Sequence, residues 1–252
     1  MSNALLVGLS RQVALARELD VVANNVANVN TNGFKRRATE FQEFVSPTAK
    51  AELFARPDQP VSFVWDRGTN LQYTQGAIET TGNPLDVAIN GDALFVVRQG
   101  GAERYTRNGA LSLNGKGELV NSDGYPIMSD QGPLTFTDQD SDIRVLPDGT
   151  VTSFQAGQVQ TKGKLRLVSV ANPQDLRNEG RNLFSSAAPV SPAKTDTNRL
   201  AVGAVERSNV KSVTEMTRLI EINRSYQAVA TMMANMDALR GTAISRLADT
   251  QS

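Results

Sequence analysis

Apolar residues recur at helical spacing near both ends of the chain. In an N-terminal arm of about residues 4–28 they stand three or four positions apart, and one stripe comprises Leu15, Leu19, Val22, Val26 and Val29. An adjoining stripe comprises Leu5, Leu9, Val13 and Ala16. This spacing predicts a helix rather than a strand. The helix should end near residues 28–33, because asparagine and glycine tolerate the left-handed backbone conformation that stops a helix.

A seven-residue repeat runs through a C-terminal arm of about residues 213–248. Its positions are occupied by Leu219, Ile222, Tyr226, Val229, Met233, Met236, Arg240, Ala243 and Leu247. Such a repeat predicts left-handed packing against other helices, as in a coiled coil. Ile220, Met232 and Leu239 widen the apolar face, so the helix has room for more than one neighbour. Taken alone, the pattern also fits an amphipathic helix lying on its own domain.

Turn-forming residues are confined to the middle of the chain. All 10 prolines, and every glycine except Gly8 and Gly241, lie within residues 33–203. Short apolar segments alternate there with Gly, Asn and Asp turns, which predicts an antiparallel β body. The predicted hairpins are 94–97 with 102–106, 111–113 with 118–120, and 143–146 with 150–152. Residues 46–68 contain three prolines and are predicted to be an extended connection rather than a regular element.

These segments together predict an α+β protein. Long N- and C-terminal helices pack as a coiled coil, and a central antiparallel all-β domain lies between them in sequence. We expect a terminal-helix domain of residues 1–34 and 206–252, a connecting stretch of residues 35–75, and a central β domain of residues 76–205.

Composition then narrows the function. The 252 residues carry 26 basic and 26 acidic side chains, a balance that argues against a nucleic-acid partner. Histidine and cysteine are absent, which removes the commonest general base, thiol nucleophiles and the usual zinc ligands. The acidic run Asp138, Asp140 and Asp142 lacks the glycine and the glutamate of a calcium loop. We therefore expect no catalytic residue, cofactor, metal or small-molecule substrate. No stretch of about 18 apolar residues predicts a membrane span, and no cleavable signal is expected.

The two striped termini indicate assembly instead. Each helix must bury its apolar residues, and the simplest partner is the other helix. Because the combined stripes are broader than one seam, further copies should cover what remains, and head-to-tail contacts of that kind build helical filaments. The expected subunit-interface residues are Leu15, Leu19, Val22, Asn24, Val26, Asn28, Leu219, Ile222, Tyr226, Val229, Met233 and Met236.

Two further positions have expected structural roles. Asn24 and Asn28 are four residues apart on one face, so their amides can fix the register of a helix–helix interface, or Asn28 can simply help to end the helix. Gly33 and Phe34 follow the helix and are expected at the domain junction, where the ring covers the join.

Three ordered motifs resemble those of flagellar basal-body rod and hook proteins. The first is residues 23–35, ANNVANVNTNGFK. The second is residues 81–91, TGNPLDVAING, continued by YTRNG at 105–109 and GELV at 117–120. The third begins with Ser208-Asn209-Val210 and continues to Arg224-Ser225-Tyr226. The length and the opening residues look most like proximal-rod members, and distal-rod members are the near alternative.

The resemblance implies a structural subunit of a hollow helical rod that crosses the periplasm and transmits motor torque. It implies export through the flagellar type III apparatus without a cleaved signal. The implied partners are other copies, proximal and distal rod proteins, bushing-ring proteins and the export apparatus. The alternative is a soluble β-rich protein with helical termini that binds carbohydrate or hydrolyses peptidoglycan, for which a pair of carboxylates would be needed.

Overall fold

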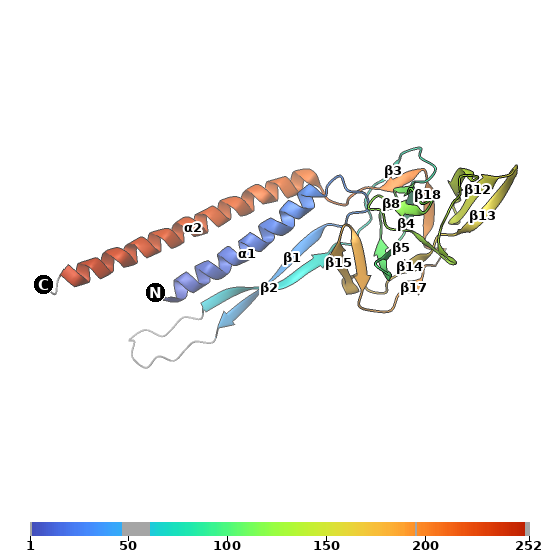
Figure 1. Ribbon diagram of the computed structural model, residues 1–252. Helices are drawn as coiled ribbons and strands as arrows, with labels where there is room; N and C mark the ends of the chain where they lie inside the picture. Colours follow the sequence, from blue (N-terminus) through green and yellow to red (C-terminus); the bar gives the residue numbers. More distant parts are fainter. Residues whose placement is uncertain (1, 47–60, 195, 250–252) are drawn as a thin grey trace. The chain divides into compact units, whose positions relative to one another are not determined.

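The computed structural model describes residues 2–46, 61–194 and 196–249 (Figure 1). The described residues form two compact units. The helical unit comprises those of residues 1–27, 37–70 and 211–252, and the β body comprises those of residues 28–36 and 71–210. The chain therefore passes from one unit to the other four times, after residues 27, 36, 70 and 210.

Two long helices account for most of the helical unit, as the spacing predicts. They are α1 (Ser2–Ala27) and α2 (Ser212–Asp249). They run antiparallel (Figure 1), because Glu18 of α1 pairs with Arg218 and the later Asn25 contacts the earlier Glu215. Near the other end of the pair, a side chain added at Gly8 would stand 3.2 Å from the Met233 side chain. Residues of α2 beyond about 239 therefore extend past the start of α1.

Two strands complete the helical unit. They are β1 (Arg37–Ser46) and β2 (Val61–Leu71), which pair with each other. The expectation that residues 46–68 contain no regular element is wrong for residues 61–68, which lie in β2. All three prolines of this stretch precede β2, and Val61-Ser62-Phe63-Val64-Trp65 is rich in the β-branched and aromatic residues that favour strands. The remainder of the expected connection, residues 47–60, lies outside the described residues.

The β body is built from short antiparallel strands, as predicted. Its main sheet has the order β15-β16-β6-β5-β14-β17. These strands are β5 (Leu94–Gln99), β6 (Ala102–Thr106), β14 (Leu167–Ser169), β15 (Leu176–Gly180), β16 (Leu183–Ser186) and β17 (Ser191–Pro192), with the 3₁₀ turn η1 (Pro173–Asp175) before β15. A three-stranded sheet contains β11 (Ser141–Val145), β12 (Thr150–Gln155) and β13 (Gln158–Lys164).

Four two-stranded pairs surround these sheets. β3 (Ile78–Thr80) pairs with β19 (Ala204–Glu206), and β4 (Val87–Asn90) pairs with β18 (Arg199–Val202). The other pairs are β7 (Leu111–Leu113) with β8 (Leu119–Asn121) and β9 (Met128–Ser129) with β10 (Gly132–Pro133).

All three predicted hairpins are confirmed as β5–β6, β7–β8 and β11–β12. The β5–β6 turn needs its two glycines, because Gly100 and Gly101 both have positive φ, at 56° and 87°.

Strand β5 explains why Leu94-Phe95-Val96-Val97 reads as a continuous apolar run. Phe95 and Val97 belong to one core cluster of the β body, with Ile89, Leu119 and Leu183 among its members. Leu94 and Val96 belong to a second cluster, which includes Tyr105, Val168 and Phe184. A strand buried on both faces carries apolar residues at every position rather than at alternate ones.

Gly109 provides a test of this packing. A Cβ at this position would stand 1.7 Å from the Val87 backbone oxygen, whereas one at Gly115 would meet nothing within 4 Å. We expect Gly109→Ala to lower the free energy of unfolding of the β body by about 1–3 kcal/mol, as overpacking does. Urea denaturation monitored by far-UV circular dichroism measures this change in the free energy of unfolding. Gly115→Ala is the control. Equal midpoints for the two variants would contradict the close approach.

Candidate functional site

Eight of the expected interface residues gather in one seam between the chain's own two helices. Leu15, Val22 and Ile222 are buried there, and five half-buried residues pack on them, namely Leu19, Val26, Leu219, Tyr226 and Val229. Met233 and Met236 follow on the same face of α2 and are also half-buried. The periodic residues of α1 and α2 thus pack against each other within one chain, and these contacts hold the antiparallel helix pair together.

Asn24 and Asn28 do not join the seam within the chain, and the position of Asn28 agrees with the alternative that it helps to end the helix. Asn24 is exposed, and Asn28 lies just beyond α1, where it accepts a hydrogen bond of 3.1 Å from the Thr31 hydroxyl. The buried amide is that of Asn25, with 0% exposure. Its position three residues after Val22, on the seam face, is the signal that could have identified it.

Apolar residues of α2 also remain exposed outside the seam. At about 100° per residue, Val213, Met216 and Ile220 lie toward the face of α2 opposite the seam residues, whereas Met232 and Leu239 lie beside the seam. Ile220 is 51% exposed and Leu239 is 70% exposed, although both were expected to widen the contact face. Ile244 continues the seam phase beyond the start of α1 and is also exposed.

α1 also exposes apolar side chains, on its face away from the seam. Leu6, Leu9 and Val13 lie there. Together with Ala14, Arg17 and Val64 of β2 they line a groove of about 460 Å³. The helical unit therefore exposes apolar side chains on two faces of α2 and on one face of α1. Grouped apolar residues of this kind indicate a surface that packs against other chains.

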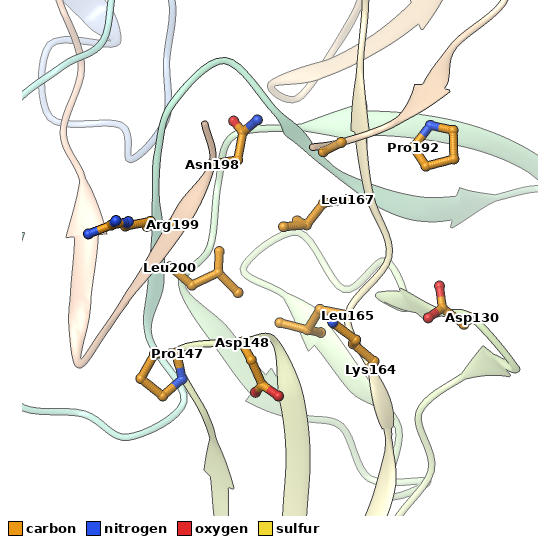
Figure 2. A pocket seen from close by; sticks show the side chains of 11 residues that line it. Asp130, Pro147, Asp148, Lys164, Leu165, Leu167, Pro192, Asn198, Arg199 and Leu200 are labelled. Carbon is orange, nitrogen blue, oxygen red and sulfur yellow. The ribbon is translucent and has the colours of Figure 1, made fainter. Parts of the chain in front are cut away.

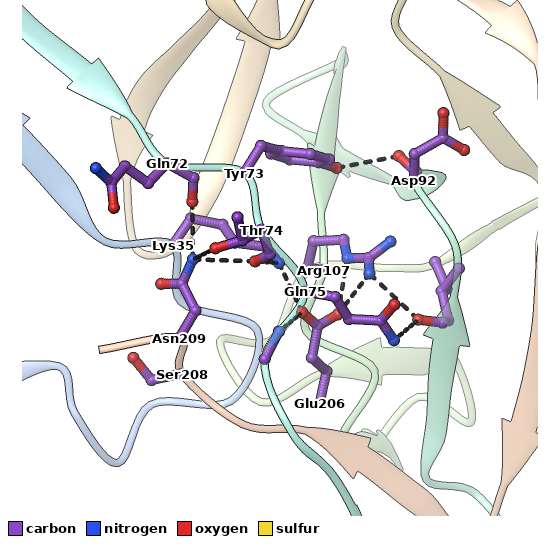
Figure 3. Close-up of polar contacts among 12 residues, drawn as sticks. Lys35, Gln72, Tyr73, Thr74, Gln75, Asp92, Arg107, Glu206, Ser208 and Asn209 are labelled. Carbon is purple, nitrogen blue, oxygen red and sulfur yellow. Dashed lines mark hydrogen bonds and ion pairs between the residues drawn. The ribbon is translucent and has the colours of Figure 1, made fainter. Parts of the chain in front are cut away.

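A buried charged cluster lies within the β body (Figure 3). It comprises Lys35, Arg107 and Glu206, each 1% exposed. Glu206 lies between the two cations: its Oε1 is 2.6 Å from Lys35 Nζ, and its Oε2 is 2.7 Å from Arg107 Nη2. The Gly76 backbone N–H donates to Glu206 Oε1 at 2.9 Å, and Lys35 Nζ also donates to the Thr74 carbonyl at 2.8 Å.

Two cations share one carboxylate in this cluster. The Tyr73 ring lies 5.2 Å from Lys35 Nζ and 5.9 Å from the Arg107 guanidinium carbon, close enough for cation–π attraction. Arg107 also donates to the backbone carbonyls of Ala93 and Ile89. Burial nevertheless lowers the pKa of Lys35 from its ordinary 10.5, although the charge of Glu206 acts to raise it. Burial likewise raises the pKa of Tyr73.

Gly33 and Phe34 lie beside this cluster in the β body. Gly33 has a φ of +68°, its N–H donates to the Glu206 carbonyl at 2.7 Å, and a Cβ there would stand 2.5 Å from the Arg107 backbone. No other residue type fits such an approach without strain. Phe34 is buried, at 5% exposure.

A pocket of about 300 Å³ in the β body is where the carboxylate pair of a glycosidase would be sought (Figure 2). Asp130 and Asp148 reach this pocket from different turns. Hydrogen bonds from Thr150 lower the pKa of Asp148, which is the opposite of what a general acid needs.

The acidic run near β11 is engaged in local contacts. Asp140 accepts hydrogen bonds from Lys162 and Ser153, and Asp142 pairs with Arg144. Among the described residues, no three acidic side chains group as metal ligands would. No described helix combines the length and apolar character needed to cross a bilayer.

A helix pair that leaves apolar flanks exposed and is joined to a β body is typical of a structural subunit that packs against further chains. Three family descriptions match the chain in order. Residues 5–35 match "Flagella basal body rod protein", residues 88–153 match "Flagellar hook protein FlgE/F/G D1 domain", and residues 201–246 match "Flagellar basal body rod FlgEFG protein C-terminal".

Relatives match over almost the whole chain. Flagellar basal-body rod protein FlgF of Caulobacter vibrioides is 39% identical over 250 residues, and that of Mesorhizobium japonicum is 33% identical, each match covering 98% of both chains. FlgG of Bacillus subtilis is 30% identical and covers 95% of this chain and 97% of its own. The chain therefore belongs to the family of flagellar basal-body rod proteins. It is a structural subunit of the flagellar basal body, assembles with other rod proteins and is not an enzyme.

The charged cluster yields a pH-dependent prediction. Glu206→Gln leaves two buried cations without a counter-charge, so we expect the free energy of unfolding of the β body to fall by about 3–5 kcal/mol. The pKa of Lys35 in the folded chain lies below its ordinary value of 10.5. At pH values between the folded-state pKa and 10.5 the unfolded chain binds more protons than the folded chain, so the free energy of unfolding rises with pH there. Removing Glu206 lowers this pKa further, so the rise begins at lower pH in the variant.

Urea midpoints measured from pH 7 to pH 10.5 would test this expectation. Glu79→Gln is the control, because Glu79 forms an exposed pair with Arg207 and should change the midpoint little. A Glu206→Gln midpoint equal to that of the control at every pH would show that the cluster is not desolvated.

Proposed function

We propose that the chain is a subunit of the proximal rod and that it forms, with other copies and neighbouring rod proteins, a hollow helical shaft that transmits motor torque. The higher identities to two FlgF proteins than to FlgG of Bacillus subtilis support the proximal assignment. The distal rod remains the second candidate, since the match to FlgG also spans nearly the full chain.

The single observation behind this proposal is the apolar surface that the helix pair leaves exposed on further faces, beside the α2 seam and opposite it. Burying apolar area gains about 25 cal/mol per Å², so leaving this surface wet forfeits several kcal/mol per chain. One neighbouring helix cannot cover two faces that point in different directions. A lattice of copies with a neighbour on each flank covers both and continues indefinitely, which is the geometry of a helical assembly.

We infer a division of labour between two sets of residues. The seam residues hold α1 and α2 together as one pair. They support assembly only indirectly, because the pair orients the exposed residues toward neighbouring chains. Ile220, Met232, Leu239 and Leu9 contact neighbouring helices, in coiled-coil packing that extends the intramolecular seam. The part of α2 beyond about residue 239 carries Ile244 in the seam phase, and there the partner is a helix from another copy.

The same proposal covers location and export. We infer that the assembled rod crosses the periplasm, that the flagellar export apparatus delivers the chain, and that bushing-ring proteins surround it. Family membership supports these inferences. The experiment that tests them is imaging of basal bodies from cells that lack this chain, where we expect truncated rods without hooks. Complete rods with hooks would overturn the proposal, and so would sugar release from peptidoglycan by the purified protein.

The exposed flank gives a sharper prediction. Ile220→Lys places a charge where a neighbouring helix would bury it, so we expect assembled subunit to fall by more than about tenfold. The isolated chain should keep its helix content, because position 220 is 51% exposed. Quantification of this chain in purified basal bodies, alongside circular dichroism of the monomer, makes the measurement.

Ser225→Lys is the matched control, since Ser225 is an exposed polar residue one turn or so further along α2. The control should assemble as the unchanged chain does. Normal incorporation of Ile220→Lys would show that this flank faces solvent in the rod.

A further inference from the structure

Asn209 forms hydrogen bonds with four residues of the β body, and Figure 3 shows those to Gln72 and Thr74. Its Oδ1 accepts from the Arg36 backbone N–H at 2.6 Å. Its Nδ2 donates to the Gln72 carbonyl at 2.8 Å and lies 3.0 Å from both the carbonyl and the hydroxyl oxygen of Thr74. Its own backbone N–H donates to the Phe34 carbonyl. We call this set the Asn209 clamp.

The positions of these partners along the chain are informative. Arg36 is the last residue of the β body before the chain enters the helical unit, and Gln72 lies just after the chain returns. Asn209 itself stands immediately before the chain leaves again, after residue 210. One side-chain amide therefore joins three of the four segments that connect the units. The Gln72 N–H donates to the Arg36 carbonyl at 2.8 Å, which closes the group.

The buried amide of Asn25 does the same within the helical unit. Asn25 Oδ1 accepts from the Arg37 N–H at 2.9 Å, and its Nδ2 donates to the Arg37 carbonyl at 2.8 Å and to Glu215 Oε2 at 3.1 Å. Asn25 precedes the exit after residue 27, Arg37 begins the return, and Glu215 is in the first turn of α2. We call this set the Asn25 clamp.

We propose that Asn209 and Asn25 are positioning residues that fix, each inside its own unit, the ends of the segments that connect the helices to the β body. This inference rests on the proposed torque-bearing function, because these four segments join the helices to the β body covalently and twisting load passes along them. Clamped ends pass load on directly, whereas loose ends rotate before they carry any.

A side-chain amide is suited to holding two chain segments together. It donates and accepts at once, so it can join a backbone N–H of one segment to a backbone carbonyl of another. A carboxylate of the same size can accept from Arg36 but cannot donate to Gln72 or Thr74. The clamp is also anchored, since the Thr74 carbonyl that receives Asn209 also receives Lys35 of the buried charged cluster.

Hydrogen exchange of the purified full-length chain tests the Asn209 clamp directly. In Asn209→Ala we expect the amides of Arg36 and Gln72 to exchange about tenfold faster or more, while core amides such as Val87 keep their rates. In Asn209→Asp the Arg36 amide keeps an acceptor and its protection. The Gln72 N–H, which donates to the Arg36 carbonyl, should exchange faster, because the carboxylate repels the Gln72 and Thr74 carbonyls and so loosens that segment. A residue that only filled space would not separate the two amides in this way.

Asn178→Ala is the control, because the Asn178 Oδ1 only accepts an exposed turn hydrogen bond from the Gly180 N–H. It should leave Arg36 and Gln72 unchanged. If Asn209→Ala does not fold, the Asp variant carries the same test, with the Val87 amide as the check on folding. Unchanged protection of Gln72 in a folded Asp variant would overturn the clamp.

The functional arm uses cells whose only copy carries Asn209→Asp. We expect complete rods and a swimming speed that falls more steeply with viscosity than in cells carrying Asn178→Ala. Identical speeds at every viscosity, with complete rods, would overturn the load-bearing role. The proposed function fails separately, if cells lacking the chain build complete rods, and the exchange result would then still stand.

Discussion

The helices carry more apolar surface than a single partner can cover, and the rest of the structure depends on this excess. One stripe from each helix closes the antiparallel pair around Leu15, Val22 and Ile222. The residues beside that stripe on α2 and opposite it on α1 are left in water. The residues that hold the helix pair together are thus different from the exposed apolar residues that favour association with further chains.

The β body has a different physical character. Its strands are short, yet β5 is buried on both faces, so two apolar clusters share one central strand. Segments distant in sequence converge on the charged cluster and on the Asn209 clamp, where hydrogen bonds and ion pairs give directional contacts. The helical unit therefore offers non-directional apolar surface for packing, and the β body offers directional contacts that hold the connecting segments.

Local patterns allowed much of this fold to be predicted. The heptad spacing of Leu219 to Met236 specified a long helix, and the Gly100-Gly101 turn specified a hairpin, because both signals lie within a few residues. Strand β2 was missed because the three prolines that precede it dominate the local pattern. Asn25 was missed because its partners, Arg37 and Glu215, become its neighbours only in the folded chain. The charged cluster could not be found either, since Lys35 and Glu206 are 171 residues apart and neither is unusual in its local sequence.

The charged cluster also raises the question of why charges are buried there at all. A buried ion pair often contributes less to stability than apolar side chains of the same volume. Apolar residues, however, would pack in several registers, whereas Glu206 has fixed positions for Lys35, Arg107 and the Gly76 N–H. The same three contacts set where residues 35, 76 and 107 lie, and the first two flank the segments held by Asn209. A subunit that carries load has more to gain from defined segment positions than from a small increase in stability, which accounts for polar contacts at the very place where the chain connects its helices to its β body.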